Sequence, residues 1–152
     1  MPYVFSSALP IAIGSDHAGY AYKTHIIQWL TNEGYTVQDL GTFSEDSVDY
    51  PDFAHPVCAR VETEQAAFGI LLCGSANGVA MTANKHAAIR AGLCWVNEVA
   101  SLVRLHNNAN VICIPARFVS LEEAKTMITT FMTTAFEGGR HANRVNKIAC
   151  TL

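Results

Sequence analysis

The sequence of 152 residues contains no apolar run long enough to cross a membrane and no extended block of positive charge. Its longest apolar runs, 68–73 and 111–114, fall far short of the ~20 residues that a membrane-spanning helix needs. The formal net charge is −3, and the basic residues are scattered until a group near the C-terminus. Binding to a nucleic-acid backbone requires a concentrated positive face. We therefore expect neither a membrane protein nor a nucleic-acid-binding protein.

The sequence also predicts neither a disulfide framework nor a secretion signal. The five cysteines are an odd number without a Cys-x-x-Cys pair, and three of them lie at or within apolar, strand-like runs. Residues 1–10 have neither the basic region nor the long apolar core of a signal peptide. We predict a cytoplasmic protein with reduced thiols, in which residues 1–9 form a flexible lead-in or extend a strand.

Half of the residues are apolar and only 15% are charged, so the composition offers no case for disorder. A chain of this length forms one core, and we expect a single domain over residues 1–152 with some apolar surface against a partner subunit. Strand-like runs alternate with helical patterns throughout. Strands are expected at 11–14, 36–40, 68–73, 89–93 and 111–114, and helices at about 19–32, 51–63, 78–86, 97–107, 120–136 and from 140. The alternation predicts an α/β fold, a three-layer α/β/α sandwich with a Rossmann-like five-stranded parallel sheet.

Local signals support several of these boundaries. Gly34 is expected to end the first helix, Asn97 to cap a later one, and Ser120 with Glu123 to form a capping box. Ligands of such sheets bind beyond the carboxyl ends of the strands. The polar residues after these ends should therefore converge at one edge: Ser15, Asp16, His17, residues 74–78, Asn97, Glu98 and Arg117.

Two nucleotide-binding motifs are incomplete. Residues 14–19 have the glycine spacing of a Walker loop, but Tyr20 and Ala21 stand where Lys and Ser/Thr would bind phosphate and magnesium. Asp16 occupies the position of the second glycine of the dinucleotide fingerprint, where a side chain would obstruct a pyrophosphate. Asp16 and His17 remain as an acid and a histidine at a strand end. A simple helix-capping role for Asp16 is the alternative.

Cys73 ends an apolar run directly before the glycine-rich turn 74–78. Successive backbone N–H groups at such a turn stabilise a thiolate or an anionic ligand, so Cys73 is a candidate base or nucleophile. A phosphatase loop would need arginine six positions later, where Val79 stands. The alternative is a buried structural cysteine, which is the better interpretation for Cys58, Cys94 and Cys113.

A basic group closes the sequence. Arg140 and Arg144 have the i, i+4 spacing that places both guanidinium groups on one helix face, where they suit a phosphate. A solvated helix end is the ordinary alternative. His106 lies near a helix end and could be a capping cation or an acid/base group. His25, His55 and His86 have no ligand-like companions at i+4 and no paired cysteines, so the sequence predicts no metal site.

Five segments in order carry a resemblance to the type B ribose-5-phosphate isomerase family, which also contains galactose- and allose-6-phosphate isomerases. They are Ile11-Ala-Ile-Gly-Ser-Asp-His-Ala-Gly19, Val48-Asp-Tyr-Pro-Asp52, Cys73-Gly-Ser-Ala-Asn-Gly78, His106-Asn-Asn-Ala-Asn-Val111 and Gly139-Arg-His-Ala-Asn-Arg144. The resemblance covers about residues 10–149. It implies interconversion of D-ribose 5-phosphate and D-ribulose 5-phosphate, a step of the pentose phosphate pathway, without cofactor or metal.

The resemblance also implies a homodimer, possibly paired into a tetramer, whose active sites are each built from two chains. It implies that Cys73 moves the proton between C1 and C2 and that His106 opens the sugar ring. The other implied contacts are Asp16 and Tyr50 to the sugar; His17, Arg117, Arg140 and Arg144 to the phosphate; Gly74, Ser75, Ala76, Asn77 and Gly78 around the enediolate; and Asn107 as a further contact. In this family His106 and Arg117 would come from the partner chain.

The sequence departs from the family at the turn. The usual pattern is Cys-Gly-Thr-Gly-Ile-Gly, whereas this chain has Ser75, Ala76 and Asn77, so the hydroxyl is retained and the turn is altered. One branch of the family uses a glutamate base where Val79 stands. Two other functions stay open on the sequence: an allose- or galactose-6-phosphate isomerase, and a non-catalytic flavodoxin-like module with Cys73 as a redox thiol.

Overall fold

Five parallel strands form the central sheet of the computed structural model, which describes residues 2–150. The strands are β1 (Ile11–Ser15), β2 (Val37–Asp39), β3 (Gly69–Cys73), β4 (Ala91–Leu93) and β5 (Val111–Pro115), in the spatial order β2-β1-β3-β5-β4. The helices are α1 (Tyr20–Asn32), α2 (Pro51–Glu62), α3 (Asn77–Ala83), α4 (Asn97–Leu105), α5 (Leu121–Thr133) and α6 (Arg140–Val145). The predicted α/β sandwich with a five-stranded parallel sheet is confirmed.

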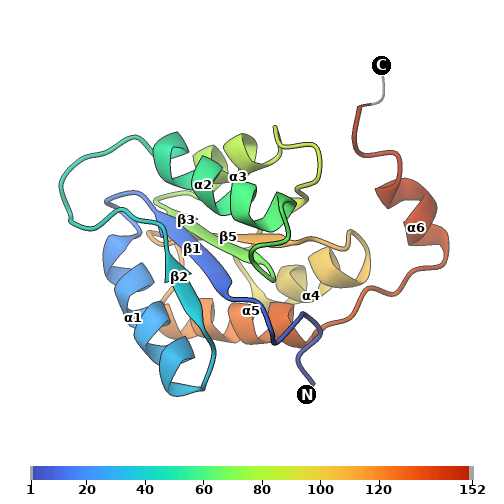
Figure 1. Cartoon of the computed structure of the whole chain (residues 1–152), viewed down its shortest axis with the longest axis horizontal. Coiled ribbons are helices and arrows are strands. Elements are labelled where there is room, and N and C mark those ends of the chain that lie inside the picture. The colour runs from blue at the N-terminus through green and yellow to red at the C-terminus, as the bar shows by residue number, and fades with distance from the viewer. Residues whose placement is uncertain (1, 151–152) are drawn as a thin grey trace.

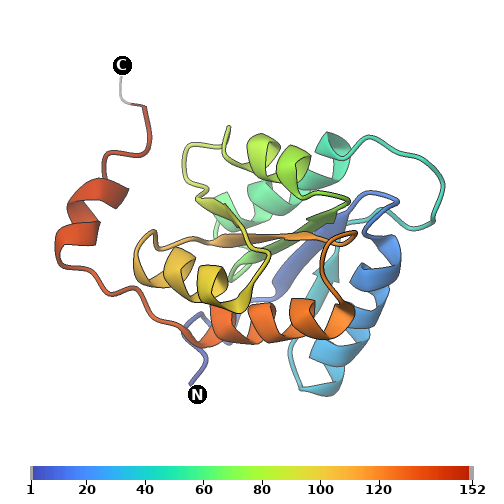
Figure 2. The ribbon, with the colours of Figure 1, turned by 180° about the vertical axis from the view of Figure 1, so that it is seen from behind.

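Helices cover both faces of the sheet, with α2 and α3 on one face and α1, α4 and α5 on the other (Figures 1 and 2). Successive β3 residues point to opposite faces, so Ile70 and Leu72 enter the core beneath α1, α4 and α5, while Leu71 and Cys73 enter the core beneath α2. All five residues of β3 are buried. A strand covered on both sides needs no polar alternation, which explains its continuous apolar run.

Two of the three predicted helix boundaries are confirmed. Gly34 adopts φ +92 after α1, and its N–H bonds to Thr31 O while Tyr35 N–H bonds to Leu30 O. Ser120 and Glu123 form the reciprocal capping box of α5. The prediction for Asn97 is wrong, because Val96 is the cap and the Asn97 Oδ1 accepts a hydrogen bond of 2.6 Å from Thr130 Oγ1 of α5.

Several elements are shorter than predicted because long-range bonds end them. Asn84 bonds to both the N–H and the carbonyl of Ala91, so α3 ends at Ala83 and β4 begins at Ala91. The backbone of Thr134 is in the extended conformation, and its carbonyl accepts a hydrogen bond from Arg104. The helix α5 therefore ends at Thr133 and does not reach residue 136.

Residues 2–9 pack against the domain. The Phe5 ring lies 4.7 Å from the Phe68 ring and 5.7 Å from the Phe131 ring, and Val4 N–H bonds to Met132 O at 3.0 Å. The expectation of a flexible lead-in is therefore wrong for these residues. The aromatic partners Phe68 and Phe131 lie more than 60 residues further along the chain, so the sequence around Phe5 does not reveal them.

Candidate active site

The carboxyl edge of the sheet, where β1, β3 and β5 end, brings together one group of predicted site residues. Cys73 pairs with Pro115 at this edge, and Ser15 pairs with Leu72. The turn after β3 contacts the segment after β5, because Arg117 N–H bonds to Gly74 O at 3.1 Å. A Cβ on Gly74 would lie 3.2 Å from the Arg117 side chain. The resemblance implied that Arg117 comes from a partner, but its side chain already lies against Gly74 of its own chain.

Cys73 is the last residue of β3, and its side chain is almost fully buried on the face covered by α2 and α3. The turn that follows contains Ala76 in the left-handed region at φ 63. Ser75 Oγ accepts bonds from the backbone and side-chain N–H groups of Asn77 at 3.4 and 3.3 Å. The Ser75 hydroxyl therefore braces the turn immediately beyond the thiol.

The other buried thiols are held in the protonated form. Burial raises the pKa of Cys58 and of Cys94 to about 12, and burial among neighbouring thiols raises the pKa of Cys113 well above its ordinary value. These groups are therefore poor bases at neutral pH, in agreement with the structural role predicted for them.

Asp16 and His17 are fixed by backbone contacts. Asp16 Oδ1 accepts hydrogen bonds from Ala18 N–H at 2.9 Å and Gly19 N–H at 3.2 Å, so this oxygen stabilises the turn that leads into α1. His17 Nδ1 accepts from Val48 N–H at 3.2 Å, which places the proton of the neutral ring on Nε2. Both residues line a cavity of about 470 Å³ together with residues 48–52. Its wall therefore offers a carboxylate oxygen and an N–H donor.

Tyr50 joins this cavity to the turn after β3. A Cβ on Gly78 would lie only 2.5 Å from Tyr50 Cζ, so the tyrosine ring rests directly on the glycine. Only a residue without a side chain permits this contact.

Gly78→Ala should displace the Tyr50 ring and lower kcat/KM several-fold, because the new methyl group and the ring cannot occupy the same space. The half-exposed ring can swing outward, so the protein should still fold. Steady-state kinetics with the sugar phosphate that the resemblance implies, together with a melting curve, separate the two effects. The control is Tyr50→Ala, in whose background Gly78→Ala should cost little more. Equal losses in both backgrounds would contradict the contact.

The second group of predicted residues lies at the opposite, amino edge of the sheet. His106 caps the C-terminal end of α4, and Glu137 N–H bonds to Leu105 O just before it. Arg140 and Arg144 lie on α6. The two edges are at least the length of β5 apart. This strand has 5 residues, and with a rise of about 3.3 Å per residue it spans about 13 Å from its first to its last Cα atom. Figure 1 shows α6 at the far end of the molecule from the loop that joins β2 to α2. One chain therefore cannot bring its own His106 to its own Cys73.

Glu137 connects two stacked histidines at this edge. His106 and His141 rings stack at 4.2 Å with an 11° angle, and their Nε2 atoms lie 3.8 and 3.6 Å from Glu137 Oε2. Desolvation, followed by the positive charges of His106 and Arg140, lowers the pKa of His141. The sequence interpretation missed Glu137, although its i, i+4 spacing to His141 is a usable signal.

Among residues 2–150, His106, Glu137 and His141 have potential ligand atoms close enough together to hold one metal ion. An ion bound by imidazole lies in the plane of the ring. Two nearly parallel, stacked rings cannot both point at one ion, so the observed arrangement is not a formed metal site. His55 and His86 also meet in the folded chain, where their ring nitrogens lie 2.7 Å apart.

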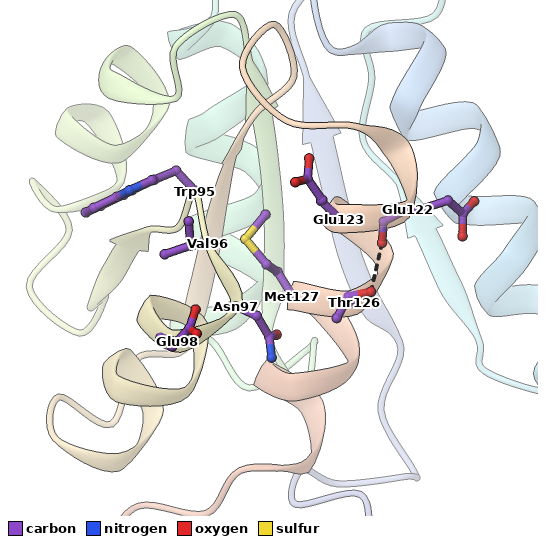
Figure 3. Close-up of a pocket in the computed structure, with 8 residues that line it drawn as sticks. All are labelled: Trp95, Val96, Asn97, Glu98, Glu122, Glu123, Thr126 and Met127. Carbon is purple, nitrogen blue, oxygen red and sulfur yellow. Dashed lines mark hydrogen bonds between the residues drawn. The ribbon is translucent and has the colours of Figure 1, made fainter.

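A separate cavity of about 390 Å³ lies between the starts of α4 and α5 (Figure 3). Asn97 and Glu98 line it, together with Trp95, Val96, Glu122, Glu123, Thr126 and Met127. The expectation that Asn97 and Glu98 converge with the residues after β1 and β3 is therefore wrong. β4 is the outermost strand, so its carboxyl end lies away from Asp16.

The chain matches a known class of protein. The family model described as Ribose/Galactose Isomerase matches residues 11–148. The chain therefore belongs to the ribose/galactose isomerase family, as its motifs predict. None of the helices in the described part of the chain has the length and hydropathy that a membrane crossing requires.

Within this family, the similarity is to type B ribose-5-phosphate isomerases. The chain is 41% identical over 138 residues to ribose-5-phosphate isomerase B of Escherichia coli, covering 91% of this chain and 93% of that protein. The ribose 5-phosphate isomerase structure from Thermotoga maritima is 45% identical with a TM-score of 0.91, over 93% and 97% of the two chains. The Mycoplasma genitalium structure with bound ribulose-5-phosphate is 39% identical with a TM-score of 0.89, over 94% and 95%.

Proposed function

We propose that this protein interconverts D-ribose 5-phosphate and D-ribulose 5-phosphate, in the pentose phosphate pathway of the cytoplasm. The observation that carries the proposal is the position of Cys73, a thiol at the carboxyl end of β3 directly before the turn 74–78, whose Gly78 contacts Tyr50 of the cavity that Asp16 and His17 also line. The relative from Mycoplasma genitalium, similar over nearly its whole length, was solved with ribulose-5-phosphate.

The reaction requires a base, oxyanion donors and a ring-opening group. Once the ring is open, the Cys73 thiolate takes the proton from C2 of the aldose. Electrons move to the carbonyl oxygen on C1 and produce an enediolate. The proton of the C2 hydroxyl passes to the adjacent negative oxygen on C1. The thiol then returns its proton to C1, and the oxygen on C2 becomes the ketone. Backbone N–H groups of residues 74–78 stabilise the negative oxygen, which forms and disappears within one turnover.

The phosphate binds to donors from both groups of residues. His17 presents an Nε2 proton because Val48 N–H occupies its Nδ1. Arg117 lies beside the turn of the same chain, whereas Arg140 and Arg144 lie at the opposite edge and would be supplied by a second copy. Guanidinium groups bind phosphate through parallel hydrogen bonds, so this set is suited to a terminal phosphate.

A homodimer with shared sites accounts for the separation of the two groups. His106 and Asn107 reach a Cys73 only if that thiol belongs to a partner. Exposed apolar side chains lie beside the active-site turn, since Trp95 and Phe118 line a cavity of about 600 Å³ together with Ser75 and Asn77. Such a patch on a polar edge suits a second copy. A further pairing into a tetramer is compatible with this dimer.

A coupled assay with ribose 5-phosphate tests the function directly. Turnover should persist in EDTA because every proposed step uses a side chain or a backbone group. Faster turnover of allose or galactose 6-phosphate would instead make the protein a hexose-phosphate isomerase. No turnover on any of the three, together with reversible oxidation of Cys73, would favour the redox module.

Arg144→Ala should raise KM for ribose 5-phosphate by roughly 10- to 100-fold, because one charge-assisted contact to the phosphate is lost. The change in kcat should be smaller, since the reacting carbons lie at the other end of the substrate. Lys125→Ala is the matched control, because it removes one positive charge from α5 at a residue paired with Glu122. Equal KM values for the two variants would rule out Arg144 as a phosphate ligand.

A further inference from the structure

Arg104 is a buried arginine, with 5% of its surface exposed, in the last turn of α4. Within residues 2–150, no carboxylate forms an ion pair with it. Burial, followed by the charge of Arg90, lowers the pKa of Arg104 to about 10. A buried cation without a counter-ion is costly unless hydrogen bonds compensate for it. The burial of Arg104 at this position therefore needs an explanation beyond side-chain packing.

The hydrogen bonds of Arg104 join two segments of the amino edge. Its Nη1 donates to Asn108 Oδ1 at 3.1 Å and to the Ala109 carbonyl, and its Nε donates to the Thr134 carbonyl at 3.1 Å. Asn108 and Ala109 directly follow His106 and Asn107, and Asn108 holds the left-handed conformation at φ 46. Thr134 begins the segment that leads to Glu137 and α6. One guanidinium group thus connects the loop of His106 to the segment of Arg140.

Phe5 covers the guanidinium group from the N-terminal segment. The Arg104 Cζ atom lies 4.6 Å from the centre of the Phe5 ring and 5.5 Å from that of Phe131. Phe5 is in residues 2–9, which precede the matched range of the family model. A ring over a desolvated cation supplies part of the stabilisation that water would otherwise give. Phe5 therefore supports Arg104 through its aromatic ring.

We infer that Arg104 and Phe5 are positioning residues for ring opening, which hold His106 in register with the segment that carries Glu137 and Arg140. The inference rests on the proposed isomerase function. Arg104 acts through its neighbours, because it is buried and its guanidinium group donates to Asn108, Ala109 and Thr134. Its role is to keep the imidazole where a partner's substrate meets it, and a displacement of about 1 Å at such a group is enough to lower turnover strongly.

The two directions of the reaction separate this role from general damage. Ribose 5-phosphate is mostly a closed ring and needs His106. Ribulose 5-phosphate has its C5 oxygen esterified, so that oxygen cannot close a ring on C2, and proton removal from C1 needs only Cys73. Arg104→Met should therefore lower kcat from ribose 5-phosphate about tenfold. Solvent deuterium exchange into C1 of saturating ribulose 5-phosphate, followed by NMR, should stay within about twofold of the wild type.

Phe5→Ala keeps the test valid if Arg104→Met fails to fold. It should lower the same forward kcat about threefold, again without slowing exchange. Phe5→Tyr keeps the ring over the guanidinium group and should restore wild-type turnover. Tyr3→Ala is the matched control, since Tyr3 packs on Phe5 and Tyr35 and lies outside the cation's contacts. It should lower thermal stability with kcat unchanged.

Parallel losses of turnover and exchange in folded variants would overturn the inference, because a structural role damages both reactions. Wild-type turnover in both variants would also overturn it. Either result leaves the isomerase function intact, since the wild type serves as its own positive control. A wild type without turnover or exchange would instead refute the proposed function.

Discussion

Cys73→Ala is expected to lower kcat for ribose 5-phosphate by at least ~10² and to leave KM nearly unchanged, because a general base contributes about 10²–10⁴ to the rate and little to substrate binding. The thiol stands at the end of β3 beside the turn 74–78, and Val79 stands where a carboxylate base would be needed. Stopped assays at saturating substrate measure kcat directly.

Cys58→Ala is the control for this result. It removes a fully buried thiol from α2, and burial raises the pKa of that thiol to about 12, so it supplies no thiolate at neutral pH. The control should lower stability more than kcat. Turnover near the wild-type value in Cys73→Ala would refute the assignment of the base. Iodoacetamide should inactivate the wild type, and ribose 5-phosphate should protect it.

Mixed dimers of two inactive variants are expected to recover activity. If Cys73→Ala and His106→Ala chains are refolded together, random pairing makes about half of the dimers mixed. Each mixed dimer has one site with both lesions and one site with none, because Cys73 of one chain meets His106 of the other. About a quarter of all sites should therefore regain turnover. The physical basis is that the two residues lie at opposite edges of one chain's sheet.

The comparison mixture combines Cys73→Ala chains with Cys73→Ala/His106→Ala chains, in which no pairing restores an intact site. Native mass spectrometry confirms the mixed species in both samples. Mixed dimers without recovered turnover would show that each chain holds its own complete site, while the isomerase assignment would stand on the wild-type assay alone.

Local sequence patterns were sufficient to predict the α/β sandwich and its parallel sheet. The run 68–73 contains no polar alternation, and such a run is expected only where helices cover both faces of a parallel strand, as they cover β3. The glycine after α1 and the Ser120–Glu123 pair act within one helical turn, so their spacing is visible in the sequence. Asp16 and Cys73 could be proposed as site residues for the same reason, because Asp16 directly follows one recognisable strand and Cys73 ends another. Their roles in catalysis stay predictions.

The boundaries and supports that depend on distant contacts could not be predicted in this way. Nothing near Asn97 announces that its side chain accepts a bond from Thr130, and nothing near Phe5 announces the cation of Arg104. The order of the strands also decides where polar ends meet, since β4 lies at the outside of the sheet and carries Asn97 away from Asp16. His106 and His141 stack at the edge opposite Cys73 because α4 and α5 both run back across the sheet. Periodicity and capping spacing reveal interactions within a few residues, whereas these contacts join positions that only the folded chain brings into range.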